Sequence, residues 1–227
     1  MDNTKSEILR YLGHKNQQVP DELHTMIDEC LAQMQGVIVP RQIHREFDIT
    51  ADSGGISLAG TEIVLRGRDI AKHLHECDKA VVIAATLGAE ADRLIVKWKH
   101  ADLTRCLILD ACATQLIEQY CDRIELEIRE KAVASGFMAT RRFSPGYGDF
   151  PLEIQPQILN LLHAETRIGL TCTDSLILLP RKSVTAIIGL GKNLSVAVGG
   201  CISCDMRAAC NYRKGIGADE CTRIDER

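Results

Sequence analysis

An arginine and a tyrosine flank a run of small and constrained residues between Arg142 and Gly148, where the sequence reads Arg-Phe-Ser-Pro-Gly-Tyr-Gly. The guanidinium group of Arg142 offers a fork of donors that fits a ligand carboxylate. Glycine and proline hold the backbone in a turn, so that peptide groups near Ser144 and Gly146 can approach the edge of a purine closely. The same residues are also typical of a rigid surface turn with a solvated arginine, which is the more common case.

A second group of polar residues interrupts an otherwise apolar segment. Asp110, Thr114 and Glu118 follow one another at intervals of four residues, which places them on one side of a helix. An inward-facing carboxylate at Glu118 could hold a ligand ammonium group, or it could pair with a neighbouring arginine. The arginine pair is the more common arrangement.

Four of the ten cysteines crowd the last part of the chain, at Cys201, Cys204, Cys210 and Cys221. A Cys-x2-Cys loop brings two thiolates onto one metal with little strain, and Cys221 could supply a fourth ligand. Zinc ribbons usually repeat a close cysteine pair, which this tail does not, so the pattern favours an iron–sulfur cluster over structural zinc. Unliganded thiols are the third alternative. The other six cysteines lie in apolar segments, where a free cysteine behaves as a small hydrophobic residue.

The elements that must position these residues are helices mixed with antiparallel strands. Apolar periodicity and capping residues predict helices over 20–35, 89–100, 102–134 and 153–163. Alternation, buried apolar runs and turn residues predict strands over 43–49, 63–65, 80–86, 137–143, 176–179 and 184–190, the last in a hairpin with 194–198. Because helices and strands do not alternate strictly, we expect an α+β fold rather than a doubly wound sheet.

The composition is that of an ordinary globular protein. The chain has 227 residues, of which 45% are apolar and 26% charged, so we expect one domain over residues 1–199, followed by a cysteine-rich metal-binding tail over 200–227. A net charge of −4 with both signs interspersed gives no attraction for nucleic acid or for an anionic membrane. The sequence shows neither a secretory signal nor a membrane-length apolar run, which predicts a cytoplasmic protein. The seven histidines sit mostly in polar positions, and we expect them to be solvated.

The segment from Arg142 to Val184 resembles the activation domain of cobalamin-dependent methionine synthase. It contains an Arg-x-x-Pro-Gly-Tyr loop, a helix, an Ile-Gly-Leu step, an Asp-Ser pair and a proline before Ser-Val. Residues 102–134 resemble the long helix of that family more loosely, whereas the first 60 residues show no recognisable match. The cysteine-rich tail is not part of the domain in the full-length enzyme, so the resemblance implies a free-standing form with an added tail.

The resemblance implies roles for five residues in binding S-adenosylmethionine. Arg142 would hold the ligand carboxylate, Glu118 the amino group, and the backbone around Ser144 and Gly146 the adenine. Tyr147 would line the reacting end, where it is also the candidate catalytic residue. These roles agree with the donor and acceptor chemistry of the residues themselves.

Two positions depart from the family pattern. Phe143 stands where the family loop has a proline, which predicts a modest loss of rigidity. Leu194-Ser195-Val196 stands where the family has a pair of tyrosines, so the resemblance implies no tyrosine contacts to a corrinoid on that side.

The implied function is methyltransferase-type reactivation of a corrinoid. Acting in trans, the chain would use S-adenosylmethionine to methylate the cobalamin of methionine synthase or of another corrinoid protein. An electron donor such as flavodoxin or ferredoxin would supply the reducing electron. The alternatives are a non-catalytic S-adenosylmethionine-binding protein and an iron–sulfur electron carrier.

Overall fold

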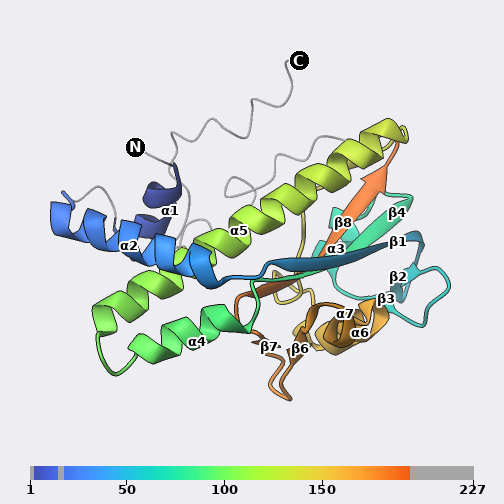
Figure 1. Cartoon of the computed structure of the whole chain (residues 1–227). Coiled ribbons are helices and arrows are strands. Elements are labelled where there is room, and N and C mark those ends of the chain that lie inside the picture. Colours follow the sequence, from blue (N-terminus) through green and yellow to red (C-terminus); the bar gives the residue numbers. More distant parts are fainter. Residues whose placement is uncertain (1–2, 15–17, 195–227) are drawn as a thin grey trace.

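An antiparallel sheet forms the centre of the computed structural model, which describes residues 3–14 and 18–194 (Figure 1). The strand order is β3-β2-β1-β4-β8-β5. The bounds are β1 (Arg41–Asp52), β2 (Gly55–Leu58), β3 (Val64–Leu65), β4 (Lys79–Thr86), β5 (Met138–Ala139) and β8 (Ser183–Gly191). With helices on both faces of this sheet, the structure confirms the predicted α+β class.

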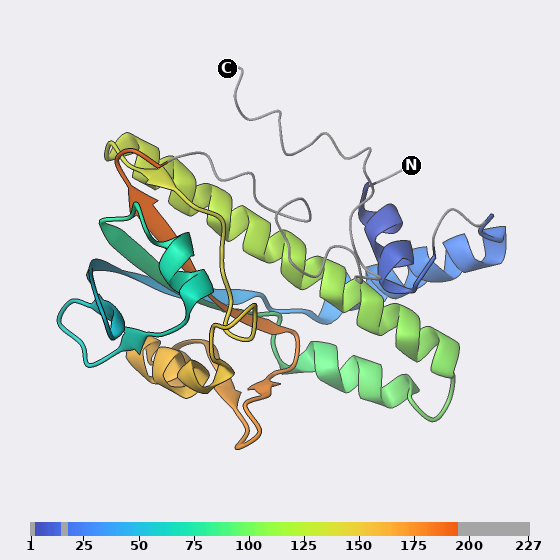
Figure 2. The same cartoon turned by 180° about the vertical axis from the view of Figure 1, so that it is seen from behind.

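Helices cover the two faces of the sheet unequally (Figures 1 and 2). One face carries a bundle of α1 (Asn3–Tyr11), α2 (Asp21–Val37), α4 (Ala89–Trp98) and α5 (Leu103–Ala134). The other face carries α3 (Arg68–His73), the 3-10 turn η1 (Leu152–Ile154), α6 (Gln155–Leu162) and α7 (Ala164–Ile168). A small hairpin of β6 (Thr171–Cys172) and β7 (Leu178–Leu179) follows α7.

Strand β4 shows why the sheet is buried on both faces. Successive side chains of a strand point to opposite faces. Val81, Ile83 and Ala85 therefore join the core under the helical bundle, while Ala80, Val82 and Ala84 join the core under α6 and α7. The apolar run that predicted a buried strand thus serves two cores.

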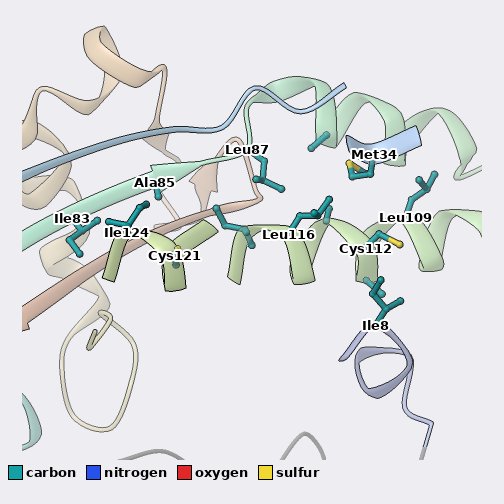
Figure 3. Close-up of a cluster of buried hydrophobic side chains, with 14 of the residues drawn as sticks. Ile8, Met34, Ile83, Ala85, Leu87, Leu109, Cys112, Leu116, Cys121 and Ile124 are labelled. Carbon is teal, nitrogen blue, oxygen red and sulfur yellow. The ribbon is translucent and has the colours of Figure 1, made fainter. Parts of the chain in front are cut away.

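Helix α5 is long enough to link the bundle to the sheet. Its first half packs against α1, α2 and α4, and its second half packs against β4, β5 and β8. Figure 3 shows this change along the helix, from Leu109 beside Met34 to Ile124 beside Ile83. The second half of α5 is thereby placed over the sheet.

Helix α5 begins and ends where the sequence predicts. The Asp102 carboxylate accepts a hydrogen bond of 3.0 Å from the backbone N–H of Arg105, which caps the first turn. At the other end, Gly136 has a φ of +77°, a left-handed conformation that glycine adopts without strain.

Replacing Asp102 by alanine is expected to lower the free energy of unfolding by about 1 kcal/mol, because the cap of the longest helix is lost. Chemical denaturation of the two proteins measures the difference. An unchanged midpoint would mean that this cap does not stabilise the helix.

The structure differs from the predicted elements in several places. A strand, β2, begins directly at Gly55, before the predicted strand at 63–65, and helix α3 was not predicted. The strand predicted over 137–143 is reduced to β5, with Thr140 and Phe143 still bonded to β8 through backbone groups. These residues lie along β8 where the predicted hairpin partner would pair, and residues 195–198 of that partner lie outside the described residues.

No helix within residues 3–14 and 18–194 is long and apolar enough to cross a membrane. The predicted domain boundary at residue 199 and the tail over 200–227 lie outside the described residues, and they remain predictions.

Candidate functional site

Arg142 is surrounded by three carboxylates of one helix. Its guanidinium nitrogens lie 2.8 Å from Glu118, 2.6 Å from Asp122 and 3.1 Å from Glu125, all on α5. The Arg142 side chain is 21% exposed and that of Asp122 is 68% exposed, so solvent reaches the cluster. The two residues predicted to bind the ends of an amino acid, Arg142 and Glu118, therefore lie together and bind each other.

The position of Arg142 is set by a strand and a helix. Phe143, the next residue, exchanges two backbone hydrogen bonds of 2.8 Å with Ile187 of β8. On the helix side, the backbone N–H of Arg142 donates to Glu125 at 3.3 Å. The arginine is thus held between β8 and α5 rather than projecting from a solvated turn.

The carboxylates determine the electrostatics of the cluster. Burial alone would lower the pKa of Arg142, but Asp122 and Glu118 outweigh burial and raise the pKa above its ordinary value. Arg142 faces three carboxylates, and Arg129 also pairs with one of them, Glu125, at 3.2 Å, so two positive charges against three carboxylates leave a formal excess of one negative charge. Such a cluster suits a ligand that carries net positive charge.

Little space remains behind Arg142. A cavity of about 10 Å³, lined by residues that include Ile83, Cys121 and Val184, lies between α5 and the sheet. That volume holds about one water molecule. Burial raises the pKa of the Cys121 thiol to about 12, so it stays protonated at neutral pH and acts as a packing residue. A ligand must therefore approach Arg142 from the solvent side.

The other two residues of the predicted polar line contact a second cation. Lys182, directly before β8, lies 2.8 Å from the Asp110 carboxylate and donates to the Thr114 hydroxyl at 2.9 Å. Its side chain is 13% exposed. The polar line of α5 is thus matched along its length by two cations, Lys182 and Arg142.

The loop after Arg142 is closed by its own backbone. The N–H of Gly146 donates to the carbonyl of Phe150, and the N–H of Tyr147 donates to the carbonyl of Ser144. Gly146 has a φ of +88°, which a residue with a Cβ adopts only with strain. Ser144 is half-buried and Gly146 exposed. Tyr147 is 66% exposed, so its ring lies at the rim of the loop.

Phe143 replaces the rigidity that a proline would give. Its N–H donates to Ile187, a bond that proline cannot make. Its ring stacks on His73 with centroids 5.0 Å apart, and lies 6.1 Å from the ring of Phe150. The predicted loss of rigidity is therefore offset by a hydrogen bond and by ring packing.

His73 corrects the expectation that the histidines are solvated. Burial lowers its pKa, and its Nε2 atom lies 2.9 Å from the Thr140 hydroxyl. The Thr140 hydroxyl in turn accepts a hydrogen bond of 2.8 Å from the N–H of Gly189 in β8. His73 is therefore a structural residue that supports the strand leading to Arg142.

Sequence reasoning missed several members of the cluster. Asp122 and Glu125 continue the spacing of Glu118 by four and then three residues, so extending the polar line along the helix would have found them. Lys182 and His73 are contributed by distant segments, and no local pattern marks them.

The predicted metal ligands Cys201, Cys204, Cys210 and Cys221 lie outside the described residues. Within the part of the chain that the structure describes, no group of three or more histidine, cysteine, aspartate or glutamate side chains is arranged to hold a metal ion. The described cysteines are free thiols. The metal site of the tail remains a prediction.

Comparison with known proteins finds a similar fold. No family model matches the sequence, and no curated protein matches it. A solved structure described as the crystal structure of the MetH reactivation domain bound to AdoHcy has a TM-score of 0.60 with this chain at 16% sequence identity. The match covers 79% of this chain and 69% of that chain. At this identity the likeness shows the fold.

Proposed function

We propose that this chain binds S-adenosylmethionine between α5 and the loop from Arg142 to Tyr147, and that it uses the ligand to methylate the corrinoid of a partner protein. The observation that carries the proposal is the pair formed by Arg142 and Glu118 at 2.8 Å. The solved structure of similar fold supports it, since that protein binds AdoHcy, which is S-adenosylmethionine without its transferable methyl group.

The ion pair already contains the two groups that an amino acid needs. A ligand carboxylate can take the place of Glu118 on the Arg142 guanidinium, and the released Glu118 can accept from the ligand ammonium group. Each charged group then exchanges one partner for another, so no charge is left unpaired. Asp122 and Glu125 keep Arg142 in position during the exchange.

The charge of the cluster suits S-adenosylmethionine as a whole. The ligand carries a sulfonium, an ammonium and a carboxylate, and therefore one net positive charge. The formal excess of one negative charge around Arg142 complements that charge. Ser144, Gly146 and Tyr147 follow Arg142 closely in the sequence. They are the proposed contacts of the adenine and of the reacting end.

The proposed reaction requires positioning and no general base. An external donor such as flavodoxin or ferredoxin would supply one electron, by way of the cysteine tail, to reduce Co(II) of the partner's corrinoid, and the resulting Co(I) would take the methyl group from the sulfonium. The products are methylcobalamin and S-adenosylhomocysteine. Irreversible methyl transfer draws the unfavourable reduction forward, and the protein contributes by holding the methyl group in line with the cobalt. Tyr147, exposed at the rim of the loop, is the proposed residue beside that methyl group.

The proposed partner is methionine synthase or another corrinoid protein, with this chain acting in trans. In this proposal Cys201, Cys204, Cys210 and Cys221 of the tail over 200–227 would hold an iron–sulfur cluster, which would supply one-electron transfer to the corrinoid.

A second candidate function is binding of S-adenosylmethionine without catalysis. It is favoured by Leu194-Ser195-Val196, which stands where the resembled family has its tyrosine pair. The two functions are distinguished by incubating the protein with S-adenosylmethionine, a reductant and free or protein-bound cob(II)alamin, and following methylcobalamin by absorption. Binding without methyl transfer to any corrinoid would support the second function.

Replacing Glu118 by glutamine is expected to weaken S-adenosylmethionine binding about three- to tenfold, because an amide still accepts a hydrogen bond but no longer complements an ammonium charge. Isothermal titration calorimetry measures the change. Glu29→Gln is the matched control, since Glu29 pairs with Arg105 at 2.8 Å on the other half of α5. Unchanged affinity in Glu118→Gln would remove Glu118 from the site.

A further inference from the structure

Two aspartates join the loop to helix α3, because the carboxylate of each accepts hydrogen bonds from backbone N–H groups of the other segment. The Asp149 carboxylate accepts from the backbone N–H groups of Arg68 at 2.8 Å and of Asp69 at 2.9 Å. In return, the Asp69 carboxylate accepts from the N–H of Asp149 at 3.0 Å. We call these three bonds the aspartate clasp. It connects segments 80 residues apart in the sequence.

The backbone on both sides of the clasp is shaped for close approach. A Cβ atom at Gly148, whose φ is +54°, would overlap the Asp69 carboxylate. A Cβ atom at Gly67, whose φ is +126°, would lie 2.8 Å from the carbonyl oxygen of Asp149. Any side chain at either position would therefore push the two segments apart. The N–H groups of Asp69 and Arg68 also hold the pKa of Asp149 below its ordinary value, as expected for a carboxylate that accepts backbone bonds.

Helix α3 is itself fixed to the protein core. Ile70 and Leu74 are buried at 0% and 2% exposure in the cluster under α6 and α7. At the far end of α3, His73 contacts Thr140 and stacks on Phe143. Helix α3 therefore holds the loop segment at both ends, with His73 near its start and the clasp at its close.

The two ends of the loop have different additional supports. Near the start, Arg142 and Phe143 are also held by β8 and by the carboxylates of α5. Near the close, the clasp holds Asp149, whose carboxylate also pairs with the exposed Arg68 guanidinium at 3.3 Å, and the next residue, Phe150, is buried in the core. Loss of the clasp should therefore loosen the loop around Gly146 and Tyr147, which remains bonded to the buried Phe150, while Arg142 stays in place.

The geometry points to Asp149 and Asp69 as positioning residues that set the Gly146–Tyr147 end of the loop for the nucleoside part of the ligand. This inference rests on the proposed function. A loop that is fixed before binding loses less conformational freedom when the ligand arrives, and this gain applies to the ligand part that the loop contacts. The amino-acid part depends on Arg142, which has its own supports.

The test compares two ligands that differ in the amino-acid part. AdoHcy carries the nucleoside and the amino acid, whereas 5′-methylthioadenosine carries the nucleoside alone. Asp149→Ala is expected to weaken both ligands by a similar factor, about five- to tenfold. Arg142→Ala is expected to weaken AdoHcy while leaving 5′-methylthioadenosine nearly unchanged. Calorimetry at a temperature where each variant is folded gives the affinities.

Conservative and paired variants separate positioning from folding. Asp149→Asn keeps one acceptor oxygen and should recover part of the affinity for both ligands. The double variant Asp69→Ala/Asp149→Ala should bind no worse than the single variant of lower affinity, because both changes break the same aspartate clasp. Asp102→Ala is the matched control, since it removes a carboxylate cap from a helix without touching the loop.

Wild-type affinity for both ligands in Asp149→Ala would overturn the inference, as would a loss confined to AdoHcy. If Asp149→Ala does not fold, Asp149→Asn is judged by the same comparison. Failure of the wild-type protein to bind either ligand would instead overturn the proposed function, and the inference with it.

Discussion

Replacing Arg142 by alanine is expected to weaken S-adenosylmethionine binding by about 1.5 to 3 kcal/mol, or roughly 10- to 150-fold in affinity. The change removes the donors for the ligand carboxylate. It also leaves Glu118, Asp122 and Glu125 facing one another without their shared cation. Isothermal titration calorimetry of the two proteins measures the difference.

Arg105→Ala is the control for this loss. Arg105 lies near the start of α5, is 17% exposed and pairs with Glu29 of α2 at 2.8 Å. Its substitution therefore removes an arginine of similar exposure that lies far from the loop. The affinity of Arg142→Lys should lie between those of the wild type and Arg142→Ala, because lysine keeps the charge but cannot bind a carboxylate in bidentate geometry. Equal binding by wild type and Arg142→Ala would contradict the proposed site.

Replacing Cys201 and Cys204 by serine is expected to abolish any brown iron–sulfur chromophore and to block reductive methylation. Each methylation needs one electron, which in this proposal would pass through the cluster held by the tail. S-adenosylmethionine binding should persist, because the proposed ligand site uses α5 and the loop. Absorption spectra, iron and sulfide analysis of anaerobically purified protein, and calorimetry together measure the three outcomes.

The cysteines that lie in the core provide the control for that experiment. Cys112→Ser changes a thiol whose pKa burial raises to about 12, and it should leave the chromophore unchanged. Stoichiometric zinc without iron or sulfide in the wild-type protein would contradict the redox role and would leave the tail a structural zinc site.

Elements with strong local signals were predicted well from the sequence. The Asp102 cap and the Ser135-Gly136 end bound α5 as predicted, and the apolar run over 80–86 is β4. Helix α3 was missed because six residues give too little periodicity, and its position depends on bonds to Asp149. Strand β5 is shorter than predicted because β8 pairs with it through only two residues in regular register.

The candidate site was predicted in its chemistry but not in its connections. Arg142 and Glu118 each had a ligand interpretation and an ion-pair interpretation, and the structure shows that they pair with each other. That contact joins a residue of α5 to one in the segment after β5, 24 residues further along the chain, which no local pattern encodes. The structure gives each residue its partner and leaves the ligand role to experiment. The same holds for Tyr147, whose exposure is known but whose ligand contact is a proposal.

The most direct test of the account is a crystal structure of the protein grown with AdoHcy. The account predicts the ligand carboxylate on the guanidinium of Arg142 and its ammonium group on Glu118. It also predicts the adenine against the backbone of Ser144 and Gly146, with the thioether sulfur facing Tyr147. AdoHcy bound elsewhere on the protein, or an unchanged Arg142–Glu118 pair at saturating ligand, would contradict it.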